Sequence, residues 1–391
     1  MPVSRRTKRV LETLSPFLEG MIGQDRSHPN PCDFMAGNPQ EIAGREYVET
    51  LQKWLEPKNP QWFGYGTPTQ PAQEAAAEGL TAELGINFEP ADILLCRGAH
   101  AGLAGILNLV VDPGDEVIYI SPPWFFYEAM ILSVGAEPVK VYVKRDGWDL
   151  DVPAIEAAIT PRTAAVLINT PNNPTGKVYP PATLAALAEV LTRKSAERGR
   201  PIYIVSDEAY SRILFPGTEM FTPASHYPNS LLVHTYSKTA LAPGQRLGYV
   251  ALPPDMPDRD ELRMSWFASS LGSSNTLPDA VMVYSLPEID HMSIDLPALA
   301  RRRDSMVSAL QEMGYELHSP EATFYVMPKV PGGDEGGFVK RLARDGVLVL
   351  PGRACDLPGY FRISLTATDD MVQRSLPVFE AAIKELQPLA S

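Results

Sequence analysis

One lysine is notable for the side chains that surround it in the sequence. The stretch T-Y-S-K-T-A-L-A-P-G-Q-R-L-G-Y places Lys238 next to two hydroxyl residues, Thr235 and Ser237, and Arg246 follows a Pro-Gly turn. An amine that forms a Schiff base needs a pKa lowered by desolvation or by nearby positive charge. Hydroxyls and an arginine suit a phosphate dianion. The stretch is typical of a reactive amine beside a phosphate, although an exposed lysine in a polar loop would read similarly.

Polar residues follow three apolar runs at the points where the runs stop. A-A-V-L-I-N ends at Asn169, I-Y-I-V-S-D ends at Asp207, and a third run ends at Thr235. Continuous apolar runs favour a mostly parallel sheet covered by helices on both faces, and such sheets bind ligands beyond the carboxyl ends of their strands. We therefore expect residues 169–173, Asp207 and residues 235–238 to converge on one crevice.

Three residues near this crevice suit a cationic aromatic ring. A buried carboxylate at Asp207 needs a cationic partner, and a protonated pyridine nitrogen would be one. Tyr210, in D-E-A-Y, and Asn173, in N-N-P-T-G, can each donate a hydrogen bond to a phenolic oxygen on the same ring. The alternatives are a helix cap for Asp207, ordinary packing for Tyr210 and turn chemistry for Asn173.

Further candidates lie on both sides of these motifs. The turn R-G-A-H-A-G at the start of a predicted helix would bind phosphate through backbone N–H groups at Gly98, Ala99 and His100, unless His100 is a catalytic base. Trp124, after S-P-P, would stack on a cofactor ring or pack in the core. Arg362, inside the apolar run Y-F-R-I-S, suits a substrate carboxylate or an internal salt bridge. Together with Lys238, these residues are what pyridoxal phosphate requires.

The composition is that of an ordinary globular enzyme. The 391 residues are 45% hydrophobic and 21% charged, and the formal net charge of -13 argues against nucleic acid or an anionic membrane as the main partner. The three cysteines lie far apart without a C-x-x-C motif, so neither a disulfide framework nor a metal site is indicated. No signal peptide and no membrane span is recognised, and we expect a cytoplasmic protein.

Helices and strands alternate from residue 93 onward. Strands are expected at 93–96, 116–120, 137–143, 164–168, 202–207, 231–235 and 247–252. Helices are expected at 1–30, 47–55, 72–84, 103–111, 124–134, 152–159 and 181–197. After about residue 257 the pattern changes to helices at 262–271, 296–313, 338–344 and 371–386, with short strands at 323–327, 347–350 and 360–365.

This order predicts an α/β protein of two domains. The large domain, residues 46–285, would contain a mostly parallel seven-stranded sheet sandwiched by helices. A smaller α+β domain, residues 286–391, would pack with the N-terminal segment, residues 1–45. Both chain termini would then belong to the smaller domain.

Taken together, the motifs resemble the fold-type I pyridoxal-phosphate enzymes, specifically the class I/II aminotransferases of the aspartate aminotransferase superfamily. The resemblance covers nearly the whole chain in the right order. It is carried by the G-N-P turn, the G-A-H turn, the aromatic residue after S-P-P, N-N-P-T-G, D-E-A-Y, S-K with its downstream arginine, and F-R-I-S. It implies that Lys238 forms the Schiff base with pyridoxal phosphate and later moves the α-proton of the substrate.

The resemblance also implies roles around the cofactor. Asp207 would pair with the ring nitrogen, Tyr210 and Asn173 would hold the phenolic oxygen, and Trp124 would stack on the ring. The phosphate would be surrounded by Gly98, Ala99, His100, Thr235, Ser237 and Arg246.

The substrate carboxylate would be bound by Arg362, assisted by Gly37 and Asn173. The family is dimeric, with a tyrosine of the neighbouring subunit reaching the phosphate. In W-F-G-Y-G-T-P-T-Q-P this residue would be Tyr65 or Phe63, and the hydroxyl of Tyr65 favours it. The loop departs from the family pattern, because Ala72-Gln73 stands where Leu-Arg is usual.

The implied activity is transfer of an amino group between an L-amino acid and a 2-oxo acid. A C–S lyase or decarboxylase on the same cofactor is the alternative, since substrate orientation decides which bond breaks. A ligand-sensing regulator would need a DNA-binding domain ahead of residue 33. We expect substrate selectivity to come from residues 20–23, 63–65 and 124–127 and from the neighbouring subunit's residues 269–275. These segments contain no evident second arginine for a dicarboxylate, which favours neutral or aromatic substrates.

Overall fold

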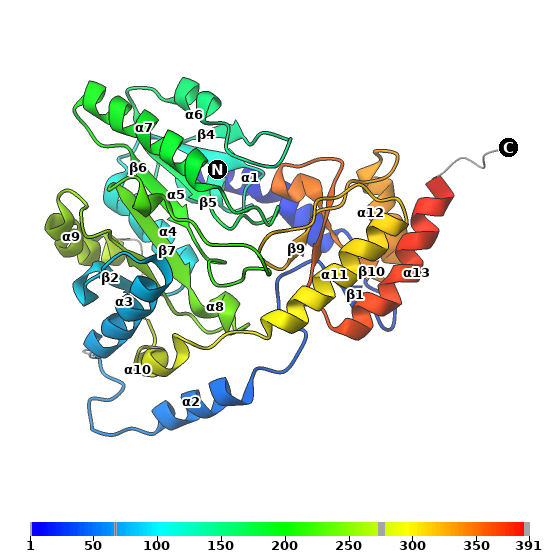
Figure 1. Ribbon diagram of the computed structural model, residues 1–391, viewed down its shortest axis with the longest axis horizontal. Coiled ribbons are helices and arrows are strands. Elements are labelled where there is room, and N and C mark those ends of the chain that lie inside the picture. Colours follow the sequence, from blue (N-terminus) through cyan, green and yellow to red (C-terminus); the bar gives the residue numbers. More distant parts are fainter. Residues whose placement is uncertain (1, 66, 68, 273–277, 387–391) are drawn as a thin grey trace.

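A seven-stranded sheet forms the centre of the computed structural model, which describes residues 2–65, 67, 69–272 and 278–386 (Figure 1). The strand order is β2-β8-β7-β6-β5-β3-β4. The strands are β2 (Ile93–Cys96), β3 (Glu116–Ser121), β4 (Glu137–Tyr142), β5 (Thr163–Asn169), β6 (Tyr203–Asp207), β7 (Ser230–Thr235) and β8 (Gly248–Ala251). β8 is antiparallel to both neighbours and the other pairs are parallel, so the predicted sheet is confirmed.

Helices cover both faces of this sheet because its strands are apolar on both sides. On one face, Val117, Leu167 and Val233 share a buried cluster with α4 (Ala99–Val110), α5 (Tyr127–Ser133) and α9 (Arg259–Gly272). On the other face, α6 (Val152–Ala158) and α7 (Pro181–Arg198) pack against Ile118 and Val166. α3 (Gln70–Leu84) and α10 (Ala280–Ile289) cover the β2, β8 and β7 end, and α2 (Arg45–Leu55) lies against α10.

A smaller lobe lies beside the large sheet. β9 (Tyr325–Val326), β11 (Leu350–Pro351) and β12 (Phe361–Ser364) form an antiparallel sheet. It packs with α11 (Leu296–Glu312), α12 (Glu335–Arg344) and α13 (Asp369–Leu386). β1 (Cys32–Asp33) pairs in parallel with β10 (Val347–Leu348), so segments from the two ends of the chain meet in this lobe (Figure 1).

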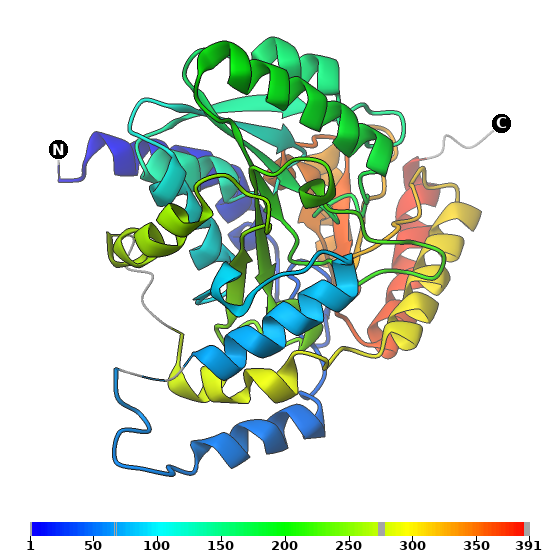
Figure 2. The same cartoon turned by 60° about the vertical axis from the view of Figure 1, so that its left-hand side comes forward.

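The N-terminal helix contacts both parts of the molecule. α1 (Arg5–Ile22) lies against α5 and against the short helix η3 (Gly352–Cys355) (Figure 2). Arg9 donates hydrogen bonds of 3.0 and 2.8 Å to the carboxylate of Glu137 on β4. Just after α1, the Gln24 side chain donates to the carbonyl oxygen of Val349 at 2.7 Å. The N-terminal segment therefore joins the large sheet to the smaller lobe.

Some expected elements differ from the observed ones. The helix expected at 124–134 begins at Tyr127, because Trp124 starts a turn in which its carbonyl accepts from the Tyr127 N–H at 3.1 Å. The strand expected at 347–350 is split, because β10 pairs with β1 whereas β11 pairs with β12. The sequence interpretation missed α10, although Asp279 caps it by accepting from the Val281 N–H.

No helix in the described ranges has the length and apolar character needed to cross a membrane. Within the same ranges, no three or more His, Cys, Asp or Glu side chains gather in a way that would hold a metal ion. The three cysteines are buried and free.

Gly102 of α4 lies where a helix approaches the sheet closely. A methyl group at this position would lie 3.0 Å from Val233 Cγ1 and 3.1 Å from Cys96 Sγ. We predict that Gly102→Ala lowers the free energy of unfolding by about 1–3 kcal/mol, because a close-packed interior does not accept the added volume. Urea denaturation measures the loss. Adding Val233→Ala should recover part of it, and strictly additive losses would contradict this explanation.

Candidate active site

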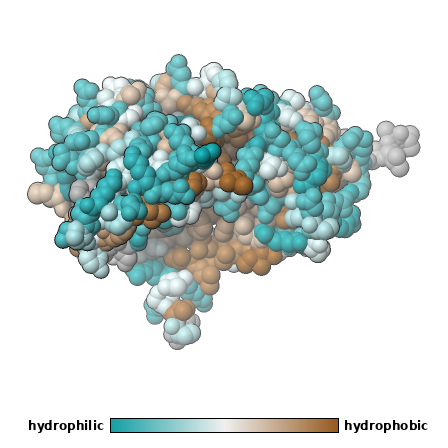
Figure 3. Space-filling view, turned by 90° about the horizontal axis from the view of Figure 1, so that it is seen from below, coloured by the Kyte–Doolittle hydropathy of each residue, from teal (hydrophilic) through white to brown (hydrophobic). Residues whose placement is uncertain are grey.

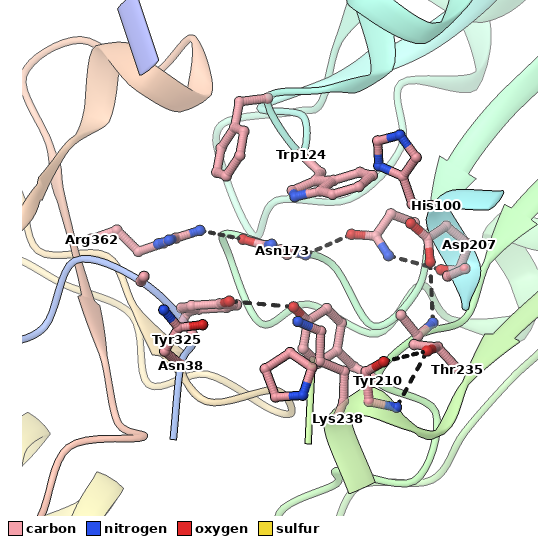
Figure 4. A pocket seen from close by; sticks show the side chains of 18 of the residues that line it. Asn38, His100, Trp124, Asn173, Asp207, Tyr210, Thr235, Lys238, Tyr325 and Arg362 are labelled. Atoms are coloured by element: carbon pink, nitrogen blue, oxygen red, sulfur yellow. Dashed lines mark hydrogen bonds between the residues drawn. The ribbon is translucent and has the colours of Figure 1, made fainter. Parts of the chain in front are cut away.

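A cavity of about 290 Å³ opens at the carboxyl ends of the parallel strands (Figure 4). Asn169, Asp207 and Thr235 reach it from the ends of β5, β6 and β7. The smaller lobe contributes Tyr325 and Arg362. The predicted convergence of the polar strand ends on one crevice is therefore confirmed, and the cavity lies between the large sheet and the smaller lobe.

Lys238 enters this cavity from α8 (Tyr236–Thr239), a single helical turn directly after β7. Thr235 begins the turn, and its Oγ1 accepts from the Ser237 N–H at 3.3 Å. The Lys238 amine lies 5.7 Å from the ring centre of Tyr210 and 5.9 Å from that of Phe324. Lys238 is partly buried on a helical turn and lines the cavity, so it is not the exposed lysine in a polar loop that the sequence left open. Among the ion pairs of the described residues, none involves Lys238.

Asp207 lies at one side of the cavity and is 5% exposed. Tyr127 donates its hydroxyl to Oδ2 at 2.6 Å, and the Ala209 N–H donates to Oδ1 at 3.2 Å. Burial raises the pKa of this carboxyl group, while the two donors and the charge of Lys238 lower it. A turn rather than a helix follows Asp207, so the helix-cap alternative does not apply. In the described part of the chain no cation forms an ion pair with it.

The predicted phosphate region lies at the start of α4. Gly98 has φ of 82°, and a methyl group there would lie 2.7 Å from Arg246 Nη2. The Ala99 and His100 N–H groups precede the first intrahelical bond, which Gly102 makes to Gly98.

The other wall of this region carries hydroxyls and a guanidinium. Thr235 Oγ1 donates to Ser237 Oγ at 3.0 Å, and Arg246 Nη1 donates to Ser237 Oγ at 3.3 Å. Burial and the charge of Arg246 lower the pKa of His100. The His100 and Trp124 rings are nearly perpendicular, and their centres lie 5.6 Å apart. Backbone donors at a helix start, with hydroxyls and a cation, form an anion-binding region.

Arg362 lies at the opposite side of the cavity and is 2% exposed. Its Nη1 donates to Asn173 Oδ1 at 2.9 Å and its Nη2 to the Met35 carbonyl at 2.8 Å, whereas Nε has no partner. The guanidinium also lies 4.1 Å from the ring centre of Tyr325. No acidic side chain of the described residues pairs with Arg362, so the internal salt bridge is wrong.

Gly37 lines the same cavity and lies against Tyr325. A methyl group there would overlap the Tyr325 hydroxyl and lie 2.8 Å from the Phe324 ring. The residue therefore has to be glycine for the chain to pass so near the cavity.

Several contacts in and behind the cavity were missed by the sequence interpretation. Tyr127 was expected to affect selectivity, yet it lies behind the cavity lining and its hydroxyl is bound to Asp207. Tyr210 donates to the hydroxyl of Tyr325 at 3.3 Å, and Tyr325 had not been singled out. These partners are distant in sequence, so no local signal identified them. Phe17 and Met35, from the N-terminal segment, also line the cavity and were not singled out, whereas Met21 lies in the segment 20–23 that was expected near the substrate.

Tyr65 does not line the cavity of its own chain. It is fully exposed, and Phe63 is 57% exposed, on the loop between α2 and α3. The contact of either residue with a neighbouring subunit stays a prediction. Of the neighbouring segment expected to affect selectivity, residues 273–275 lie outside the described residues.

Comparisons with known proteins agree with this geometry. Residues 32–378 match the family model "Aminotransferase class I and II". The chain belongs to this family. It is 32% identical over 321 residues to the aspartate/prephenate aminotransferase of Thermus thermophilus, covering 78% of this chain and 79% of that protein.

Solved structures give the same result over nearly the full length. An aminotransferase from Eubacterium rectale superposes with a TM-score of 0.87 at 28% identity, covering 99% of this chain and 97% of that one. The T. thermophilus aspartate aminotransferase with maleate gives a TM-score of 0.81 at 27% identity, covering 98% and 100%. The protein is therefore an aminotransferase that depends on pyridoxal phosphate.

The residues present fit this cofactor. Asp207 is a buried carboxylate without a cation, which a pyridinium nitrogen would supply. The helix start at Ala99 and the Arg246 guanidinium offer donors for a phosphate. Lys238 offers an amine between these two ends of the cavity.

We predict that Asp207→Asn stabilises the cofactor-free protein. The folded-state pKa of Asp207 is raised by burial, so its contribution to stability is present at low pH and is lost as pH rises through that pKa. At pH 8 the variant should be more stable by about 1–3 kcal/mol, and the difference should shrink toward pH 4.

Thermal unfolding with and without pyridoxal phosphate measures this difference. The cofactor should stabilise the wild type more than the variant, because only the carboxylate gains a pyridinium partner. A cofactor-free variant that is less stable than the wild type at pH 8 would contradict the assignment of Asp207.

Proposed function

We propose that this aminotransferase acts on neutral or aromatic L-amino acids, with Lys238 as its catalytic residue. The observation that carries the proposal is the pair of buried, uncompensated charges, Asp207 and Arg362, on opposite sides of the Lys238 amine. A cofactor with a cationic ring and a substrate with a carboxylate would supply the two missing partners.

Different side chains of this cavity would bind the substrate carboxylate, the cofactor phosphate and the cofactor ring. Arg362 would bind the substrate α-carboxylate through a bidentate contact, with Asn173 and the chain at Gly37 beside it. The phosphate would be held by Gly98, Ala99, His100, Thr235, Ser237 and Arg246. Trp124 would lie on one face of the cofactor ring, and Tyr210 and Asn173 would donate to its phenolic oxygen.

Lys238 would both attach the cofactor and move a proton. Pyridoxal phosphate, when bound, supplies an electron sink that makes the α-hydrogen of the substrate acidic. Held beside that hydrogen, the free Lys238 amine would take the proton from the α-carbon and return it two atoms away, which is a 1,3-proton shift. Asp207 would keep the ring nitrogen protonated, and Tyr127 holds Asp207 in place through the 2.6 Å hydrogen bond.

The cavity wall near the substrate side chain is apolar. Phe17 stacks on Phe125 with ring centres 3.9 Å apart, and Met21 lies in the same wall. The lysine and arginine side chains that line the cavity among the described residues are Lys238, Arg246 and Arg362. Lys238, Arg246 and Arg362 already have roles, so a second substrate carboxylate has no arginine of this chain in the described lining. This favours neutral or aromatic donors over the aspartate named for the T. thermophilus relatives.

A homodimer with shared active sites is part of the proposal. Large apolar side chains are exposed on α2, on the following loop and on α9, including Leu55, Phe63, Met264 and Phe267. Figure 3 shows apolar surface gathered around a hollow on the side where α2 lies. Burial of this surface would bring Tyr65 of one chain to the phosphate region of the other.

We also propose a division into two domains and a location in the cytoplasm. The paired β1 and β10 support a small domain formed by residues 1–45 and 286–391, and the seven strands lie within residues 46–285. The three free cysteines accord with a reducing cytoplasm.

A panel of amino donors tests the substrate class. Conversion of the bound aldehyde to the amine form should be faster with aromatic and neutral L-amino acids than with aspartate. Phe17→Ala should raise KM for an aromatic donor about tenfold and leave KM for alanine unchanged, because only the larger side chain reaches the apolar wall. Lys238→Ala is the blank and should lack the visible cofactor band.

Two results would count against this proposal. Aspartate as the best donor would contradict the substrate class. Release of pyruvate from a donor, with no amine form of the cofactor, would indicate lyase chemistry instead.

Arg362→Gln tests the carboxylate site. The variant should raise KM for every L-amino acid about a hundredfold, because a charge-assisted bidentate contact is lost. A primary amine without the carboxylate serves as the control substrate, and its slow reaction should be unaffected. Equal losses for both substrates would show that Arg362 acts on folding rather than on binding.

A further inference from the structure

A buried carboxylate behind Lys238 connects two segments that face the cavity. Tyr236, two residues before Lys238, donates its hydroxyl to Asp290 Oδ1 at 2.7 Å. Arg212, two residues after Tyr210, donates through Nη1 to the same oxygen at 3.3 Å and also to the Asp290 carbonyl. The residue that follows α10 therefore holds the lysine segment and the ring-binding segment at one point.

The charges at this junction are largely shielded from water. The side chains of Arg212, Asp290 and Glu83 are 16%, 12% and 17% exposed, and Arg212 Nε donates to Glu83 Oε2 at 2.9 Å. Burial raises the pKa of Tyr236, and the charge of Asp290 raises it further, so the Tyr236 hydroxyl stays protonated as a donor. Removing one partner from such a buried network leaves another without compensation.

The backbone of α3 fixes the Asp290 carboxylate from the other side. A methyl group at Gly79 would overlap Asp290 Oδ2 and lie 3.2 Å from Arg212 Nη2. α3 and α10 lie side by side, and both share a buried cluster with Tyr236 (Figure 2). The carboxylate is therefore held between a helix backbone, a guanidinium and a hydroxyl.

The lysine segment needs such support. α8 has four residues, and one helical turn is not stable on its own. Proton transfer is sensitive to geometry, and a displacement of about 1 Å can lower a rate about a hundredfold. We propose that Asp290 is a positioning residue, which fixes the Lys238 amine relative to the Asp207–Tyr210 segment through Tyr236 and Arg212. The proposal rests on the role of Lys238 given above.

Two conservative variants of the holoenzyme test this role. Tyr236→Phe removes one hydroxyl, and Asp290→Asn removes the charge with little change of shape. Each should lower kcat about tenfold with KM nearly unchanged, because Arg362 still binds the substrate carboxylate. An α-deuterated amino acid should show a larger isotope effect on kcat than with the wild type. In the double variant the losses should not add, since both changes act on the same Tyr236–Asp290 contact.

Cofactor release gives a readout that does not depend on turnover. Pyridoxal phosphate should leave both variants about ten times faster than the wild type, since the lysine and ring segments are no longer held together. Asp92→Asn is a matched control, because Asp92 is also a buried carboxylate bound by arginines, Arg259 and Arg263, at the start of β2, the end of the strands opposite to Lys238. It should lower the melting temperature without changing the isotope effect or the release rate.

The outcomes separate the two proposals. Wild-type kcat, isotope effect and release rate in Tyr236→Phe would overturn the positioning role, whatever happens to the melting temperature. If Asp290→Asn does not fold, Tyr236→Phe still decides. A visible cofactor band that survives in Lys238→Ala would instead overturn the assignment of Lys238.

Discussion

The cavity depends on two buried charges that are held apart. Asp207 and Arg362 are almost fully buried, and ions in a medium of low polarity are unfavourable without a partner. Neutral groups keep each charge in place without cancelling it, as Tyr127 does for the carboxylate and Asn173 does for the guanidinium. In the proposed function, the free energy needed to bury these charges would be recovered when a cofactor and a substrate of opposite charge bind, which would link their affinity to the fold.

A buried carboxylate with a tyrosine donor also lies behind the lysine, but there its charge is paired. There Asp290 has its counter-ion, Arg212, within the chain, and Tyr236 adds a hydroxyl donor. The charge of Asp290 is therefore paired within the chain, whereas the two charges in the cavity have no ion-pair partner among the described residues. Paired support behind an unpaired site is the arrangement expected of a preorganised enzyme, because less ordering is left for the moment of reaction.

The sequence predicted much of the large sheet, since strands buried on both faces read as continuous apolar runs that end at polar residues. The motifs that contain Lys238, Asp207 and Arg362 also predicted that these three residues lie at one site. The sequence could not pair Tyr127 with Asp207 or Tyr236 with Asp290, because the partners lie 80 and 54 positions apart and no local pattern joins them. α10 was missed because valines and an internal proline, Pro287, are weak helix signals.

Because β1 pairs with β10, the N-terminal segment cannot reach its place until the ribosome has made residues 347–348. The strands of the large sheet, with Lys238 and Asp207, are complete at residue 251, long before Arg362 is synthesised. Domains generally fold as units during synthesis, so the cofactor half of the cavity forms first. In this interval β1 has no partner strand, although α1 can already pack against α5 and β4, and an unpaired strand edge on a nascent chain promotes aggregation.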